Sequence, residues 1–369
     1  MMVRKLNVLF LIFVLICTVI GPAFAQSSEP ATDAAAQKLY LPLVQTIGQA
    51  EGTDAEEPAV TDIDVAEDEE VVAAASGITE FPIPTANSGP LFITFGPDGR
   101  FWFTEKNANK IGRIRNNGNI TEFAVPTANS QPFDITAGPD GKLWFTELAG
   151  AKVGRITTGG NVTEFALAFA NSGPEGITSG PAGSNTLWFT DYTLERIGRI
   201  TTNGAVTEVQ IPTPNGSPTD IALGADGNLW FTQFFGNRIG RVTPNFSFTD
   251  FAVPTPNSRP NRITAGPDGN LWFTEILGNK IGRITPGGVV TEFTIPTANS
   301  QPGDITAGPD GNLWFTESAG NKIGRITPSG VITEFAIPTP NSGPVGITSG
   351  NGSLWFTENT ANKIGRITP

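Results

Sequence analysis

The acidic side chains are the residues of this sequence best suited to proton chemistry, because histidine is missing altogether. The chain has 369 residues, of which 35 are Asp or Glu, one is Cys and none is His. A histidine base, a Ser-His-Asp or Cys-His pair and a His-liganded zinc are therefore excluded. A carboxylate acts as a base near neutral pH only where its surroundings raise its pKa. The available chemistry thus depends on where the fold places these acids.

One set of acids recurs at a regular spacing, directly after copies of the tripeptide W-F-T. The seven positions are Glu105, Glu147, Asp191, Gln233, Glu275, Glu317 and Glu358, of which Gln233 alone is not acidic. A ring of carboxylates would suit a metal ion. However, each copy also carries bases nearby, such as Lys322 and Arg325 in N-K-I-G-R. Because a scaffold needs the same contacts in every copy, we expect structural ion pairs or strand-end charges here.

The elements that position these acids follow from a repeat. Seven tryptophans stand 41 to 44 residues apart, at positions 102, 144, 188, 230, 272, 314 and 355. A repeat of about 42 residues indicates a repeat architecture, and no helical apolar pattern is long enough for paired helices. The 43 glycines and 30 prolines instead favour short strands and tight turns.

Each repeat contains four short runs that are typical of strands. In the sixth copy we predict strands over 304–306, 313–316, 322–327 and 332–335, separated by turn dipeptides such as Asp310-Gly311. Because every link is short, each unit is an antiparallel meander. Seven such units predict an all-β, seven-bladed β-propeller over residues 77–369.

The ends of the repeat region predict how the ring closes. The chain stops after a third strand at 364–368, and its first recognisable run, 77–81, matches a fourth strand. We therefore expect the N-terminal strand to complete the seventh blade and so hide two sheet edges. The Trp and Phe of each W-F-T point to opposite faces of the blade and should form the core between blades.

Differences between the copies indicate one end of the ring as the functional mouth. They concentrate on the two residues after the proline that opens each first strand, and on the residues after W-F-T-E. Binding sites of such folds are expected where loops differ, although unselected drift in loops is the alternative. The predicted ligand-binding residues are Phe92, Phe133, Asp134, Glu175, Tyr192, Asp220, Phe234, Arg262 and Asp304.

The first 76 residues differ in composition from the repeats. Residues 1–25 combine Arg4 and Lys5, an apolar run and a small-residue site, which predicts a secretory signal peptide, with an uncleaved anchor as the alternative. Residues 26–76 hold 12 acids and only Lys38 as a base, which predicts a disordered linker. Its apolar stretch at 39–44 is either a docking peptide or an accident of composition. We expect a secreted or cell-envelope protein.

The repeat motifs resemble those of the streptogramin B lyase (virginiamycin B lyase) family. The resemblance covers 77–369 and rests on G-P-D-G-x-L-W-F-T-E-x-x-G-N-K-I-G-R-I-T, with I-T-E-F-x-I-P-T-P-N-S between copies. It implies a seven-bladed propeller and an Mg²⁺-assisted elimination that opens a cyclic depsipeptide antibiotic at its ester bond. The positions that match the family's catalytic residues carry other side chains: Gly303 and Val345 for two histidines, Leu91 for a tyrosine, Gly343 for one acid, and Glu358 or Asn359 for another.

Because the histidines that the resemblance implies are missing, we expect a non-catalytic ligand-binding or scaffold module without a cofactor. The alternative is a divergent lyase that uses Mg²⁺ and the mouth carboxylates Asp134, Glu175, Asp220 and Asp304. An inert structural module is a third reading. The expected partner is a small molecule or peptide at the mouth of a monomer. The chain's net charge of −12 argues against nucleic acid, and no membrane span is expected once the signal is cleaved.

Overall fold

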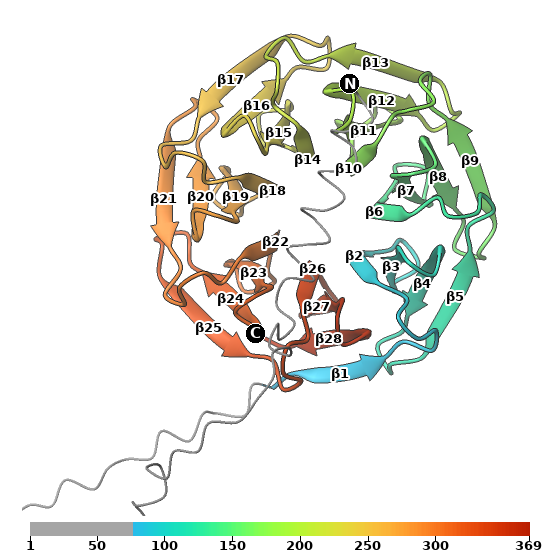
Figure 1. The fold of residues 1–369 in the computed structure, drawn as a ribbon, viewed down its shortest axis with the longest axis vertical. Helices are drawn as coiled ribbons and strands as arrows, with labels where there is room; N and C mark the ends of the chain where they lie inside the picture. The colour runs from blue at the N-terminus through green and yellow to red at the C-terminus, as the bar shows by residue number, and fades with distance from the viewer. Residues whose placement is uncertain (1–76) are drawn as a thin grey trace, which may run out of the picture. The chain divides into compact units, whose positions relative to one another are not determined.

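The computed structural model describes residues 77–369, which form a ring of seven four-stranded antiparallel sheets (Figure 1). The predicted seven-bladed propeller is therefore confirmed. The signal peptide at 1–25, the linker at 26–76 and its apolar stretch at 39–44 lie outside the described residues. No helix within residues 77–369 is long and apolar enough to cross a membrane.

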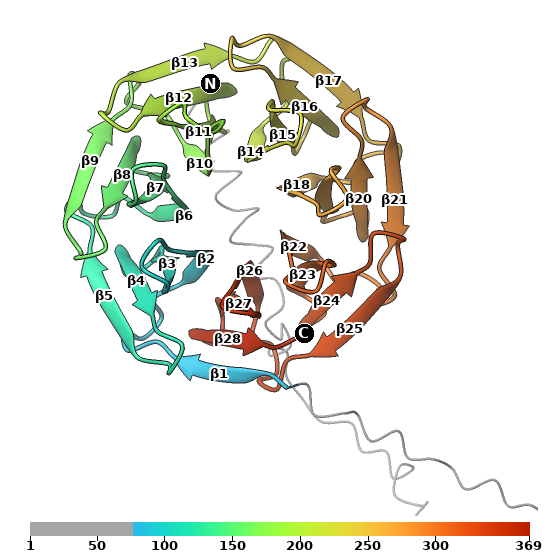
Figure 2. The same cartoon turned by 180° about the vertical axis from the view of Figure 1, so that it is seen from behind.

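Each blade runs from an innermost first strand to an outermost fourth strand, as both views show (Figures 1 and 2). The first three blades are β2 (Pro90–Phe95), β3 (Phe101–Glu105), β4 (Lys110–Ile114) and β5 (Ile120–Ala124); β6 (Pro132–Ala137), β7 (Leu143–Glu147), β8 (Lys152–Ile156) and β9 (Val162–Ala166); and β10 (Pro174–Ser179), β11 (Thr186–Asp191), β12 (Arg196–Thr201) and β13 (Val206–Gln210). The next three are β14 (Pro218–Leu223), β15 (Leu229–Gln233), β16 (Arg238–Val242) and β17 (Phe248–Ala252); β18 (Pro260–Ala265), β19 (Leu271–Glu275), β20 (Lys280–Ile284) and β21 (Val290–Thr294); and β22 (Pro302–Ala307), β23 (Leu313–Glu317), β24 (Lys322–Ile326) and β25 (Ile332–Ala336).

The seventh blade closes the ring with strands from both ends of the described chain. It consists of β26 (Pro344–Gly350), β27 (Ser353–Glu358), β28 (Lys363–Ile367) and the N-terminal β1 (Thr79–Pro82). β1 pairs antiparallel with β28, with Phe81 opposite Ile364. The predicted closure is therefore confirmed, and β28 has a partner strand on both sides.

The core lies between blades, as the alternation in W-F-T predicts. Trp102 packs in one cluster with Leu143 and Phe145 of the next blade, whereas Phe103 packs in another with Trp355 of the blade before. Opposite Phe103 stands Gly112 of β4, where an added Cβ would lie 2.1 Å from the phenyl ring. Glycine is therefore required in K-I-G-R-I, because the phenyl ring fills the place of a side chain.

A bulge opens the first strand of every blade and re-aims the two residues that vary most. In blade 1 the pairing with β3 shifts between Pro90 and Ile93, so Leu91 and Phe92 lie in the bulge. The same shift occurs at the start of β6, β10, β14, β18, β22 and β26. Bulges redirect side chains next to functional sites, and here they direct one variable pair per blade.

The threonine of each W-F-T holds these bulges in place. The Thr146 hydroxyl accepts a hydrogen bond from the Asp134 amide at 3.0 Å and donates to the Glu175 carbonyl of the next blade at 2.6 Å. The same relay runs through all seven blades, ending where Thr357 donates to the Leu91 carbonyl and closes the circle. The equivalent donors in the other blades are Thr104, Thr190, Thr232, Thr274 and Thr316.

The acids after W-F-T are not neutralised as the sequence predicts. Glu317 at the end of β23 is fully buried, and Lys322 instead places its Nζ 2.9 Å from Oε2 of Glu334 in β25. Arg325 lies over the Trp314 and Phe335 rings. Four more blades repeat the lysine pairing: Lys110–Glu122, Lys152–Glu164, Lys280–Glu292 and Lys363–Glu80. The predicted ion pair exists, but its acid belongs to the fourth strand.

The buried glutamates are protonated instead. Burial and the Glu334 carboxylate raise the pKa of Glu317 to about 8, although the positive charge of Lys322 opposes the shift. Burial acts in the same direction on Glu334, but hydrogen bonds from Lys322 and Thr297 outweigh it and lower the pKa of that carboxyl. The fourth blade supports this assignment, because Gln233 Nε2 donates to Asp250 Oδ1 at 2.6 Å. An amide there takes the place of a protonated acid.

We predict that Glu317→Gln makes the protein more resistant to alkali. A carboxyl with a pKa of about 8 when folded and about 4.3 when unfolded stabilises fully below about pH 4, and this contribution is lost as the pH rises to about 8. The amide does not titrate. The melting temperature of the variant should therefore match that of the wild type at pH 4.5 and exceed it by about 2 °C or more at pH 9, the shift that about 1 kcal/mol gives in a large domain.

The matched control is the reverse change, Gln233→Glu, which should lower the melting temperature at pH 9 and leave it nearly unchanged at pH 4.5. A Glu317→Gln variant that is less stable than the wild type at pH 9 would contradict the protonated assignment.

Candidate functional site

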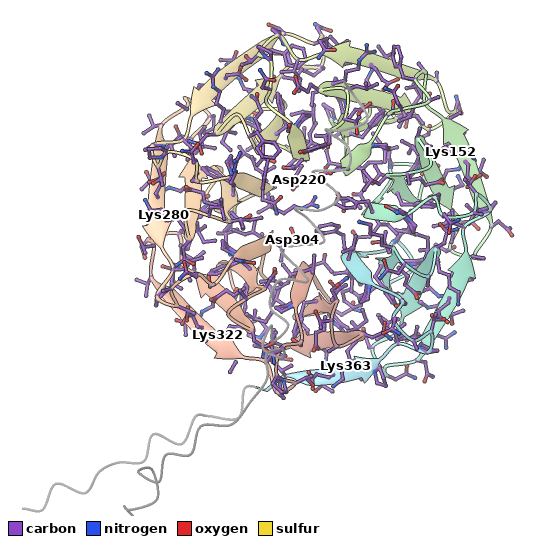
Figure 3. The ribbon with its side chains drawn as sticks, in the orientation of Figure 1. Lys152, Asp220, Lys280, Asp304, Lys322 and Lys363 are labelled. Atoms are coloured by element: carbon purple, nitrogen blue, oxygen red, sulfur yellow. The ribbon has the colours of Figure 1, made fainter. Side chains whose placement is uncertain are left out.

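The variable residues meet at one end of the ring, as predicted. The start of each first strand lies beside the end of the second strand, as where Pro90 stands opposite Glu105 and the Lys106 amide donates to the Gly89 carbonyl. Figure 3 shows Asp220 and Asp304 next to the central axis, whereas Lys152, Lys280, Lys322 and Lys363 lie toward the outer strands. The lysines of the outer strands and the aspartates of the mouth are therefore separate sets of charged residues.

Arg262 is the centre of the mouth. It lies in the bulge of β18, and its side chain is only 2% exposed. Its Nη1 is 3.5 Å from Asp220 Oδ1 and 3.9 Å from Asp134 Oδ2. Its guanidinium carbon lies 3.7 Å from the ring centre of Phe92 and 5.4 Å from that of Phe133. One side chain of blade 5 thus joins residues of blades 1, 2 and 4.

The three aspartates of the mouth tie neighbouring blades together. Each carboxylate accepts a hydrogen bond from an isoleucine amide in the next blade: Asp134 from Ile177 at 3.0 Å, Asp220 from Ile263 at 2.8 Å and Asp304 from Ile347 at 2.9 Å. Asp134 and Asp304 also accept from the amide of the residue that follows them. These acids are therefore held by the backbone in fixed orientations.

Burial raises the pKa of all three aspartates. Burial raises the pKa of Asp134 and of Asp304 to about 7, although the positive charge of Arg262 opposes the shift. Burial likewise raises the pKa of Asp220, again against the charge of Arg262. One arginine does not compensate three carboxylates, so Asp134 and Asp304 change protonation near pH 7.

Glu175 differs from the aspartates in its bonding. It lies directly after the first proline of β10 and is 3% exposed. Burial raises its pKa to about 8, and the charges of Arg262 and Lys106 lower it only in part. Within residues 77–369 its carboxylate accepts no backbone N–H. Tyr192 stands near it, because the Glu175 charge adds to burial in raising the pKa of that phenol. Among the described residues, Glu175 is therefore a buried acid to which no backbone amide donates a hydrogen bond.

The predicted mouth residues fall into two groups. Phe92, Phe133, Asp134, Asp220 and Arg262 are in contact, and the two phenyl rings are 5.4 Å apart. Glu175 and Asp304 join them through the charge of Arg262. Phe234 does not join them, since it packs edge-on against Phe235 under Arg259. Tyr192 lies between the groups, because it interacts electrostatically with both Glu175 and Arg259.

Two cations of the mouth were not among the predicted site residues. Lys106 places its Nζ 5.7 Å from the Phe133 ring centre, and Arg259 interacts with Tyr192. Both differ from the other copies at their positions, and Arg259 stands where the other repeats have Gly, Gln or Ser. Comparison of the copies at the residue before each proline would have found Arg259.

The acids of the mouth do not form a ligand set for Mg²⁺. Within residues 77–369 no three His, Cys, Asp or Glu side chains are grouped so as to hold a metal ion. Asp134 and Asp220 flank the Arg262 guanidinium instead. Both oxygens of Asp134 and Oδ2 of Asp220 also accept hydrogen bonds from backbone amides. We therefore derive no chemical step through a metal.

We predict that Arg262→Gln destabilises the protein in a pH-dependent way. Removing one partner of a buried ion pair costs about 3–5 kcal/mol, because the remaining charges are left uncompensated. The loss of unfolding free energy in urea should be greatest near pH 8, where the acids are ionised, and smaller at pH 5, where they bind protons. Adding Asp220→Asn should recover part of the loss at pH 8. A loss that is equal at both pH values would contradict the charge cluster.

Comparison with known proteins gives a close match over the whole ring. The family model of the virginiamycin B lyase family matches residues 68–260 and 214–369. The chain is 44% identical to the crystal structure of a virginiamycin B lyase from Staphylococcus aureus, with a TM-score of 0.76 over 79% of this chain and 99% of the lyase. A structure of a streptogramin B lyase is 43% identical, with a TM-score of 0.75 over 78% of this chain and 96% of the other.

A third structure holds a ligand. It is a catalytically inactive histidine-to-alanine variant of the Staphylococcus aureus lyase with quinupristin, 43% identical to this chain, with a TM-score of 0.76 and the same coverage as the first.

These matches correct the functional prediction. We expected a non-catalytic binding or scaffold module because histidine is missing, and that prediction is wrong: identity of 43–44% extends over almost the full length of enzymes that are lyases. The resemblance drawn from the repeat motifs is confirmed, together with the fold that it implies. The chain belongs to the virginiamycin B lyase family.

Proposed function

We propose that this protein is a lyase that opens a cyclic depsipeptide by elimination at its ester bond, with Glu175 as the base. Membership of the virginiamycin B lyase family supports the reaction class. The related lyase is inactive when one histidine is replaced by alanine. This chain has no histidine, so another group must take the proton.

Glu175 is the acid that fits this task best, and its bonding is the observation that carries the proposal. The carboxylates of Asp134, Asp220 and Asp304 each accept a hydrogen bond from a backbone amide of a neighbouring blade. Glu175 does not, and burial raises its pKa to about 8, close to the working range of a general base. It also follows the proline of its first strand, as do Gly303 and Val345, the positions that the resemblance gives to the family's histidines.

The elimination balances with these residues alone. The Glu175 carboxylate takes the proton from the carbon α to a carbonyl, and the released electron pair forms the double bond to the β carbon. The bond from the β carbon to the ester oxygen breaks, and that oxygen leaves as a carboxylate. Negative charge develops first next to the carbonyl and then on the leaving group. The positive charges of Arg262 and Lys106, both of which act on Glu175, favour that charge.

The tyrosine beside this base remains a proton donor at neutral pH. Burial and the Glu175 charge raise the pKa of Tyr192, and its phenol also interacts with Ser217. A protonated phenol next to Glu175 can donate a hydrogen bond to a substrate oxygen without competing for the proton.

The same proposal extends to where the protein works. The basic and apolar pattern of residues 1–25 supports export, and the acidic 26–76 segment supports a spacer that separates the ring from whatever precedes it. We place the activity outside the cytoplasm, in a monomer.

We predict that Glu175→Gln lowers kcat/KM for the opening of quinupristin by about 10²–10⁴-fold, the usual contribution of a general base. In the wild type, kcat/KM should rise with pH and level off above about pH 8, because the base must be ionised. Mass spectrometry of the linear product measures both quantities. The matched control is Glu317→Gln, which makes the same change at a buried acid whose charge partners are Glu334 and Lys322 of the scaffold, and it should keep the wild-type rate. A Glu175→Gln variant with unchanged rate, or a rate that falls with pH, would rule out this base.

A further inference from the structure

A second group of side chains lies at the mouth, apart from the residues around Arg262. Among the described residues, five large apolar side chains are exposed, and two of them, Phe235 and Leu277, occupy the same position at the mouth ends of neighbouring blades 4 and 5. Blades 2 and 6 carry Ala149 and Ala319 at this position. The core therefore does not require a large side chain here.

Arg259 joins this cluster from a backbone conformation that an arginine rarely adopts. Its φ is 61°, and such residues outside glycine cost of the order of 1 kcal/mol or more, so they persist where something holds them. The Arg259 carbonyl accepts a hydrogen bond from the amide of Ile276, the residue that precedes Leu277. Its guanidinium carbon lies 4.2 Å from the Phe235 ring centre and 5.4 Å from that of Phe234.

The stacked guanidinium keeps its hydrogen-bonding capacity. Burial lowers the pKa of Arg259, and the interaction with Tyr192 opposes this shift. Within residues 77–369 no acceptor takes a hydrogen bond from the guanidinium. A planar guanidinium that lies on aromatic rings still presents N–H groups along its edge. An acceptor that arrives from the mouth would meet donors that are already oriented.

We propose that Phe235, Arg259 and Leu277 determine substrate specificity, by binding an apolar side chain of the cyclic depsipeptide and an amide carbonyl beside it. This inference rests on the proposed function. The cluster continues into the proposed catalytic site, because Tyr192 interacts with both Arg259 and Glu175. The apolar side chain would cover Phe235 and Leu277, and the carbonyl would accept from the Arg259 edge. A peptide ring presents both groups together, which a simple sugar or an inorganic anion does not.

The variants for the test come from the protein's own repeats. Arg259→Gln introduces the residue that blades 2 and 6 carry at this position with the same positive φ, and Phe235→Ala introduces the residue of blades 2 and 6. Each should fold normally, which the melting temperature checks. The control is Arg196→Lys, because Arg196 also lies over a phenylalanine, Phe169, at 3.9 Å, but on a third strand, where five other blades carry lysine.

Quinupristin is the probe, measured in two ways with the full chain. In the Glu175→Gln background, calorimetric titration gives binding without turnover, and we expect Arg259→Gln and Phe235→Ala each to weaken it about tenfold, equivalent to about 1.4 kcal/mol. In the wild-type background the same changes should raise KM by a similar factor with kcat within about twofold. Arg196→Lys should alter neither quantity.

The outcomes separate this inference from the proposed function. Turnover with a KM that neither variant changes overturns the specificity role and leaves the lyase standing. Binding that depends on Arg259 without any turnover overturns the elimination and supports the role of the cluster. A wild-type chain that neither binds nor opens quinupristin overturns both.

Discussion

Seven threonine hydroxyls, one at the inner edge of each blade, are the contact on which the mouth depends. A bulge leaves backbone groups without strand partners, and buried groups of this kind are costly unless they are bonded. Each threonine accepts from the bulge of its own blade and donates to the bulge of the next, as Thr146 does between Asp134 and Glu175. The hydroxyl therefore fixes both the angle between blades and the direction of the variable pair. Chemistry at the mouth can change while this relay stays the same.

The protein accommodates buried carboxyl groups in two ways. At the ends of the second strands, five buried glutamates have raised pKa values and lie near a second acid that a lysine compensates, as in Glu317, Glu334 and Lys322. At the mouth, several acids surround one arginine and titrate together near neutral pH. The first arrangement repeats and belongs to the scaffold. The second occurs once, and its acids change charge within the range in which a lyase would work.

Much of the fold could be predicted from the sequence, because each repeat contains the same pattern of strand and turn residues. The strands predicted for the sixth blade differ from β22, β23, β24 and β25 by at most two residues at either end. The charge partners could not be predicted in this way. Lys322 does stand opposite Glu317 in the strand register, but its flexible side chain reaches Glu334, which keeps more water than the fully buried Glu317.

The candidate site was predicted in part, and its interpretation was not. Comparison of the repeats found the bulge residues around Arg262, because these residues differ between the copies. The bulge directs them to the mouth. It did not show that Phe234 belongs with Arg259, because that contact joins two blades. The absence of histidine led to the wrong functional class. A reaction needs a base of suitable pKa, and burial gives Glu175 a pKa of about 8 without an imidazole.

The pairing of β1 with β28 sets an order for folding during synthesis. β1 leaves the ribosome with the first blade, but its partner strand, residues 363–367, is the last of the 28 to be made. Until then the ring is open. The edge of β1 lacks its partner strand, and the first blade lacks the seventh blade against which it packs. Chains released early would expose the open ring to other copies. Formation of the closed mouth therefore waits until residues 363–367 have been made.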